Sequence, residues 1–131
     1  MRKSYSCRKF LGDRSGAQAV EFAIIAPVLF AFMFGIFEVG RLTFEKNRVA
    51  AAAAAGARAV SLYGASDTTH INAAINAKLP YAADIDLTDT TFGGQAFKQI
   101  VITYDFDFLI KLAPGMSGVT ISATRYAPAA S

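Results

Sequence analysis

The sixteen residues from Phe22 to Phe37 include no charged side chain, and an acid stands at each end of the run, Glu21 before it and Glu38 after it. Counted from Ala17 to Gly40, the segment has 24 residues. As a helix it would be roughly 36 Å long, enough to cross a hydrocarbon layer of about 30 Å. Because charges inside the layer are costly, a transmembrane span is predicted with its two acids near the interfaces.

Charge is unevenly distributed along the chain. Residues 1–16 carry five basic side chains and one acid, whereas residues 17–131 carry eight basic and nine acidic ones. The pI of about 9.2 therefore reflects a basic leader and not a phosphate-binding surface, so no nucleic-acid partner is expected. Basic residues are more frequent on the leader side of the span, which favours a cytoplasmic leader at 1–16 and an extracytoplasmic domain.

A single long helix is predicted over 17–63, transmembrane at 17–40 and amphipathic at 41–63, with a stop at Gly64–Asp67. Its second half has an apolar stripe, and its other face carries charges that are expected to be solvated. The stripe consists of Val39, Leu42, Val49, Ala53, Gly56 and Val60, and the charges are Arg41, Glu45 and Arg48.

Residues 64–131 are predicted to form a small α+β domain. A short helix is expected over 68–79, ending before Pro80. Alternating apolar residues predict a strand at 100–108, followed by a turn at Pro114-Gly115 and a hairpin partner at 119–124. A weaker strand near Ile85 and Leu87 is joined through Gly93-Gly94. The expected fold is an antiparallel sheet whose apolar face packs on the stripe of the long helix.

Catalytic and metal-binding patterns are weak. Cys7 is the only cysteine and His70 the only histidine, which excludes an internal disulfide and any site with several histidines. We expect His70 to lie on a helix surface and Asp84, Asp86 and Asp89 to lie in a solvated loop, because an EF-hand loop would need a glycine and a distal glutamate. Asp105 and Asp107 are interpreted as charged edge-strand positions. No enzymatic activity, cofactor, metal or small-molecule substrate is predicted.

The segment RSGAQAVEFAIIAPVLFAFMFGIFEVGRL, followed by AAAAAGARAV, resembles the TadE-like family of pseudopilins, minor components of the tight-adherence (Flp, type IVb) pilus. The resemblance covers about residues 15–60 and implies a pilin-like fold. It also implies a single-pass protein of the bacterial inner membrane that contributes to pilus assembly and surface adhesion. The matching positions are Gly16, Val20, Glu21, Phe22, Pro27, Gly35, Glu38, Gly40, Arg41 and Gly56-Ala57-Arg58.

By this resemblance, a prepilin peptidase would cut between Gly16 and Ala17 and discard the leader. Glycine suits such a site because its backbone can enter a narrow cleft. Glu21 would then pair with the new terminal amine of a neighbouring subunit, whereas the simpler interpretation makes Glu21 a solvated marker of the helix start. The apolar helix from Phe22 to Phe37, with Pro27 and Gly35 inside it, would contact membrane lipid and other pilins.

Two alternatives stay open. The chain could be an uncleaved single-pass protein or a secreted binding protein whose first 37 residues act as an anchor or signal. An ordinary signal peptide has an apolar core of about 7–15 residues followed by small residues, and here the alanines near Ala50 come late. As a pilus component, the protein could enter the fibre or stay in the membrane as a scaffold.

Overall fold

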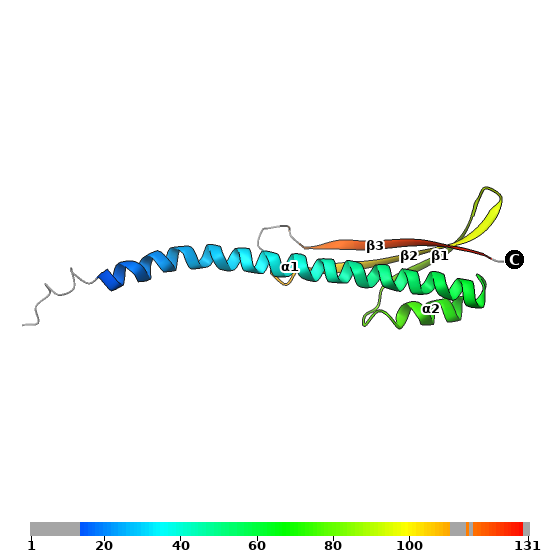
Figure 1. Cartoon of the computed structure of the whole chain (residues 1–131), viewed down its shortest axis with the longest axis horizontal. Helices are drawn as coiled ribbons and strands as arrows, with labels where there is room; N and C mark the ends of the chain where they lie inside the picture. Colours follow the sequence, from blue (N-terminus) through cyan, green and yellow to red (C-terminus); the bar gives the residue numbers. More distant parts are fainter. Residues whose placement is uncertain (1–13, 111–114, 116, 130–131) are drawn as a thin grey trace, which may run out of the picture. The chain divides into compact units, whose positions relative to one another are not determined.

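The computed structural model describes residues 14–110, 115 and 117–129 (Figure 1). The chain divides into two compact units, residues 1–37 and residues 38–131. In the described part, the first unit consists of the beginning of helix α1, and the second contains the rest of α1 with all the other elements.

Helix α1 spans Arg14–Tyr63, so it begins within the segment that the sequence analysis assigns to the leader. Helix extension adds one hydrogen bond per residue, and a glycine such as Gly16 weakens a helix by only about 1 kcal/mol. The end at Tyr63 is where the sequence places it. There Gly64 adopts a φ of 92° and donates its backbone N–H to Val60 O at 2.9 Å, which caps the helix.

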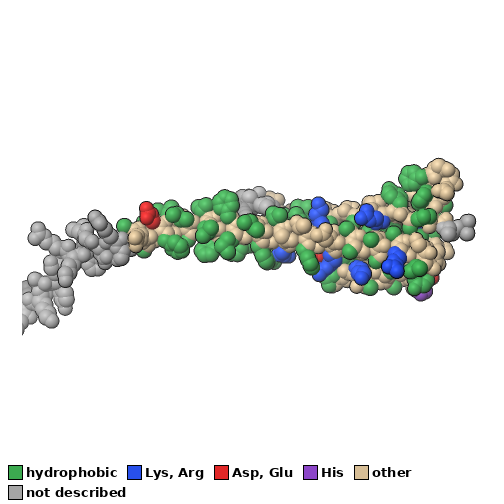
Figure 2. All heavy atoms as spheres, viewed as in Figure 1, with side chains coloured by type: hydrophobic (Ala, Val, Ile, Leu, Met, Phe, Trp, Pro, Cys, Tyr) green, Lys and Arg blue, Asp and Glu red, His purple; other side chains and the backbone are tan. Residues whose placement is uncertain are grey.

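In the first unit, the apolar side chains of α1 are exposed on all sides. Among the described residues, one helix is long and apolar enough to cross a membrane, and it is α1. Figure 2 shows hydrophobic side chains along this part of the helix. Exposed fractions reach 67% at Phe22 and 73% at Ile36. A surface of this kind is unfavourable in water and suits lipid or another helix.

The second unit contains a three-stranded antiparallel meander in the order β1-β2-β3, with strands at Asp84–Phe92, Gln95–Asp107 and Gly118–Pro128. The predicted α+β fold with an antiparallel sheet is confirmed, including the weaker first strand. Phe92 pairs with Gln95 across Gly93 and Gly94, whose φ values of 58° and 81° suit a two-residue hairpin turn.

Helix α2 spans Thr68–Asn76, three residues shorter than predicted. The Asp67 side chain caps its start by accepting from the backbone N–H of His70 at 3.1 Å. This hydrogen bond, more than any other contact, lowers the pKa of the Asp67 carboxyl. After Asn76 the chain continues in a tighter turn, with Lys78 N–H donating to Ile75 O at 3.0 Å, and still buries Leu79.

The core of the second unit lies between one face of the sheet and the two helices. Small residues predominate on the buried side of α1, which lets its backbone approach α2 and β2 closely. The facing residues of α2 and β2 are mainly isoleucines. The buried members of the core are Val49, Ala52, Ala53, Ala59, Val60, Ile71, Ile75, Leu79, Ile100, Ile102, Phe106, Ile121 and Ala127. The predicted stripe is confirmed at Val49, Ala53, Gly56 and Val60 and is wrong at Val39, which is 63% exposed because Glu38 takes the inward position.

Gly56 is the position where this close approach is tightest. A Cβ atom there would lie 2.9 Å from Cγ1 and Cδ1 of Ile75 and 3.3 Å from Cδ1 of Ile100, and both isoleucines are fully buried. We expect Gly56→Ala to lower the stability of the second unit by about 1 kcal/mol, since overpacking outweighs the gain in helix propensity. Thermal unfolding in detergent micelles, followed by near-ultraviolet circular dichroism, measures this change.

The matched control is Gly40→Ala, because a Cβ at Gly40 has no atom within 4 Å. That variant should be as stable as the original chain or more stable, by up to about 1 kcal/mol. Equal stabilisation by the two substitutions would contradict the close packing at Gly56.

Candidate functional site

The candidate site consists of the two ends of the apolar part of α1. At the N-terminal end, Gly16, Ala17, Glu21 and Phe22 are all helical and exposed. A Cβ at Gly16 would have no atom of the described part of the chain within 4 Å. Ala17 and Glu21 are four residues apart on one helix and therefore lie on the same face.

The other predicted positions of this segment lie along the same helix. Pro27 and Phe37 are exposed and Gly35 is half-buried, and a Cβ at Gly35 would have no atom within 4 Å. Pro27 lies inside α1, which continues through it. The structure therefore leaves the surface of this segment free to contact lipid or protein. Cys7 lies outside the described residues.

At the C-terminal end, the Glu38 side chain is buried and holds α1 to the end of β2. Its Oε1 accepts from the backbone N–H of Leu109 at 2.9 Å, and its Oε2 accepts from Nη1 of Arg41 at the same distance. The Arg41 guanidinium lies 4.9 Å from the centre of the Phe106 ring. Both carboxylate oxygens are thus satisfied, which a buried charge requires.

The sequence analysis placed Glu38 at a membrane boundary and missed this packing role. The available signal was the spacing of three between Glu38 and Arg41, which suits an ion pair on one helix face. Because Glu38 belongs to the folded unit, the exposed apolar segment ends at Phe37. From Ala17 it has 21 residues, about 32 Å of helix, which still matches a bilayer core.

A partly buried network replaces the solvated face expected at Glu45 and Arg48. Tyr81 donates its hydroxyl to Glu45 Oε2 at 2.6 Å, Arg48 donates to Glu45 Oε1 at 3.2 Å, and the Tyr81 ring stacks on Tyr104 at 4.0 Å. The expectation was wrong because the segment after α2 covers this part of α1. Burial, reinforced by the Glu45 carboxylate, raises the pKa of the Tyr81 hydroxyl. The stabilisation that this hydroxyl provides is therefore present below the ordinary tyrosine pKa and is lost in stronger alkali.

The acidic residues singled out in the sequence do not converge on a site. Asp84, Asp86 and Asp89 lie in strand β1 and not in a loop, and Asp89 pairs with the buried Lys98 at 2.6 Å. Among the described residues, no group of three or more His, Cys, Asp and Glu side chains could hold a metal ion. His70 is exposed, as expected, and its Nδ1 lies 2.7 Å from Asp67.

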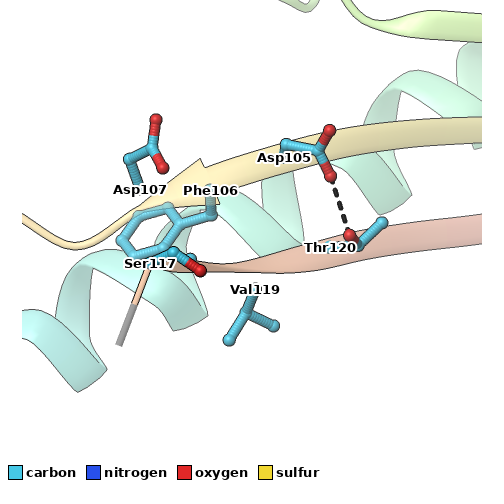
Figure 3. Close-up of a pocket in the computed structure, with 7 residues that line it drawn as sticks. Asp105, Phe106, Asp107, Ser117, Val119 and Thr120 are labelled. Atoms are coloured by element: carbon cyan, nitrogen blue, oxygen red, sulfur yellow. Dashed lines mark hydrogen bonds between the residues drawn. The ribbon is translucent and has the colours of Figure 1, made fainter. Parts of the chain in front are cut away.

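Asp105 and Asp107 border a shallow pocket of about 240 Å³ at the end of the β2–β3 ladder (Figure 3). Asp105 accepts a hydrogen bond from Thr120 at 2.7 Å. β2 is the central strand, but its pairing with β1 stops at Thr103, so the two aspartates lie where β2 is locally an edge. Their placement agrees with charged edge positions, and the pocket is open and too small for a buried ligand.

Residues 16–58 match the family of TadE-like proteins. The TadE-like match begins at the glycine of the candidate cleavage site and includes the apolar segment, Glu38 and most of the helix that carries the core. No curated protein and no solved structure matches the chain. The TadE-like family is a family of structural pilus components and not of enzymes, and the match covers about a third of this chain, including its N-terminal apolar helix.

The contact between Glu38 and Leu109 can be tested by substitution. Glu38→Ala should lower the stability of the second unit by about 1–3 kcal/mol, because it leaves the Leu109 N–H without its acceptor and Arg41 without its partner. Glu38→Gln keeps an acceptor, so its stability should lie between that of the original chain and that of Glu38→Ala. Hydrogen exchange of the Leu109 amide should accelerate in the same order, and unchanged exchange in Glu38→Ala would contradict the contact.

Proposed function

We propose that the protein is a minor pilin or pseudopilin that is anchored in the bacterial inner membrane by residues 17–37 and contributes to assembly of a tight-adherence (Flp, type IVb) pilus for surface adhesion. One observation carries the proposal: the TadE-like match includes the first part of α1, up to Phe37, whose apolar side chains are exposed on all sides. The charge distribution supports a cytoplasmic N-terminus and an extracytoplasmic second unit. Its partners would be membrane lipid, other pilins and the assembly platform.

Maturation would remove the leader by prepilin-peptidase cleavage between Gly16 and Ala17. Helix α1 begins at Arg14, so the peptidase must unwind the first turn to obtain an extended substrate. This unwinding requires little energy, because the first four N–H groups of a helix have no partner inside it and Gly16 weakens the turn further. The structure therefore supports cleavage at a helix end that opens easily.

Assembly would depend on Glu21. Cleavage gives Ala17 a terminal ammonium, and an ammonium and a carboxylate about 4 Å apart at an effective dielectric near 20 attract by about 4 kcal/mol. This attraction is comparable with the insertion cost of about 2.5–3.5 kcal/mol for a charged residue at a helix centre. Pairing with the amine of a neighbouring subunit would offset that cost and set the stagger between subunits.

The secreted alternative is disfavoured by the core. A signal peptidase acting near Ala50–Ala57 would cut inside α1, where Ala52 and Ala53 are fully buried, and would remove Val49 from the folded unit. A product of this kind would lose the Glu38 and Glu45 contacts as well. The uncleaved anchor keeps the fold, and the N-terminus of the protein in cells distinguishes it from the pilin.

Intact-mass and N-terminal sequence measurements test the cleavage. In cells with an active prepilin peptidase we expect a mature chain starting at Ala17, and in cells without the peptidase an unprocessed chain. Gly16→Leu should block processing because its side chain fills the space needed in the cleft, while Gly35→Leu, also inside the apolar segment, should be processed normally. A chain that keeps its leader beside an active peptidase would refute the pilin proposal.

The role of Glu21 is tested by Glu21→Gln, which removes the charge and keeps the size. We expect normal recovery in the membrane fraction and a fall of about tenfold or more in surface pili, since an attraction of several kcal/mol is lost. Glu21→Asp, which keeps the charge on a shorter side chain, should assemble better than Glu21→Gln. Normal pilus formation by Glu21→Gln would contradict the pairing.

A further inference from the structure

We infer that the second unit binds a second copy of this chain, with the outer face of the sheet on one copy packed against the helix side of the next. The outer face is the side of the sheet that points away from α1. The helix side is the opposite side of the unit, formed by α1, α2 and the helix-facing residues of the strands. The inference rests on the proposed membrane attachment and adds a protein surface that the apolar helix does not include.

The outer face of the sheet is acidic at one end. Odd-numbered residues of β2 alternate with the buried Ile100, Ile102 and Phe106, so they point away from the helices. Figure 3 shows Asp105 and Asp107 on the side of the strands opposite Phe106. The β1 residues Asp84 and Asp86 pair with Thr103 and Val101 and share this face. None of the four aspartates forms a salt bridge with another described residue.

The helix side carries the complementary charge. Its exposed basic residues that form no salt bridge with a described residue are Lys46, Arg58, Lys78 and Arg125. Arg125 pairs with Ile100 and lies on the helix-facing side of β3. Figure 2 shows Lys and Arg side chains gathered over the helices of this unit. The described acids of the helix side are each paired, Glu38 with Arg41, Glu45 with Arg48, Asp67 with His70 and Asp89 with Lys98.

The two charged sets lie at the same level along the unit. Arg41 lies over Phe106, which stands between Asp105 and Asp107 in β2. The Cα of Gly56 faces Ile100, which is next to Val101, the residue of β2 that pairs with Asp86. The acidic stretch of the sheet therefore runs beside α1 from about Arg41 to Gly56. Lys46 lies inside this range and Arg58 just beyond it.

Exposed apolar residues lie on both faces at the end of the unit away from Asp105 and Asp107. Phe92 makes edge contacts with Phe97 and Tyr126 on the outer face, with ring centroids 5.9 and 5.6 Å apart, and Phe92 is 55% exposed. On the helix side, the last turn of α1 exposes Leu62 and Tyr63. Since β2 runs antiparallel to α1, the two apolar sets also lie at the same end of the unit.

These faces determine the kind of partner. Residues 38–131 carry eight acidic and eight basic side chains, so copies do not repel one another through net charge. Two acidic faces would repel each other, which disfavours symmetric pairing through the outer face. An acidic face and a basic face on one protomer instead give a heterologous contact that repeats from copy to copy. Exposed ion pairs are weak, but attachment to one membrane raises the effective concentration of the copies.

Cross-linking in membranes tests the geometry. In a full-length chain with Cys7→Ser, Ser122→Cys marks the outer face and Ala54→Cys marks the exposed side of α1, and Ser66→Cys serves as a control in the turn before α2. When differently tagged chains are coexpressed, we expect a short bismaleimide to link Ser122→Cys to Ala54→Cys. The pairs of Ser122→Cys with itself and with Ser66→Cys should remain at background. A predominant link between two Ser122→Cys chains, or no link, would overturn the inference.

Charge reversal supplies a second test that separates misfolding from lost contact. Asp84→Lys with Asp86→Lys places two positive charges in the acidic stretch of the outer face, and Lys46→Glu with Arg58→Glu places two negative charges on the helix side beside it. Each double variant alone should reduce the cross-link about tenfold, and coexpression of the two should restore it, because opposite faces again meet. Failure of restoration would refute the charge pairing. Membrane fractionation of the same samples tests the proposed anchoring separately, so a membrane-bound chain without cross-link contradicts this inference alone.

Discussion

The burial of the Glu38 carboxylate determines where the apolar helix ends and the folded unit begins. A charge can be buried only if its hydrogen-bond capacity is filled, and Leu109 and Arg41 fill it here. This contact holds α1 to the end of β2 and so orients the face that carries Val49, Ala52 and Ala53 toward the sheet. One continuous helix therefore has two environments, a surface exposed on all sides up to Phe37 and a core-forming face from Glu38 onward.

The second half of α1 combines this role with close packing. Its alanines and Gly56 leave space for the branched side chains of α2 and β2, which explains how a sheet of only three strands obtains a stable backing. The same helix carries Arg41, whose guanidinium lies 4.9 Å from the centre of the Phe106 ring of β2, and Glu45, which accepts a hydrogen bond from Tyr81. Residues that look like a solvated charged face in the sequence thus connect the helix to its neighbours.

In the proposed pilus function, the two ends of the apolar segment have different tasks. The N-terminal end opens for processing and offers Glu21 for pairing, and it needs a helix turn that unwinds readily. The C-terminal end belongs to the folded unit, where Leu109 and Arg41 hold the Glu38 carboxylate.

Much of this architecture follows from the sequence alone, because it depends on local patterns. The uncharged run, the alternation along 100–108 and the glycines at 93 and 94 reflect hydrophobic periodicity and turn geometry, and each predicted helix and strand exists in the structure, while the turn predicted at Pro114-Gly115 includes residues outside the described part. Tertiary structure decided the features that depend on contacts between residues far apart in the sequence. The inward turn of Glu38 in place of Val39, the Tyr81 hydroxyl on Glu45 and the opposite charges of the two faces each require residues far apart in the chain to meet. Burial of a polar group is set by its distant partners, and the sequence near it carries no record of them.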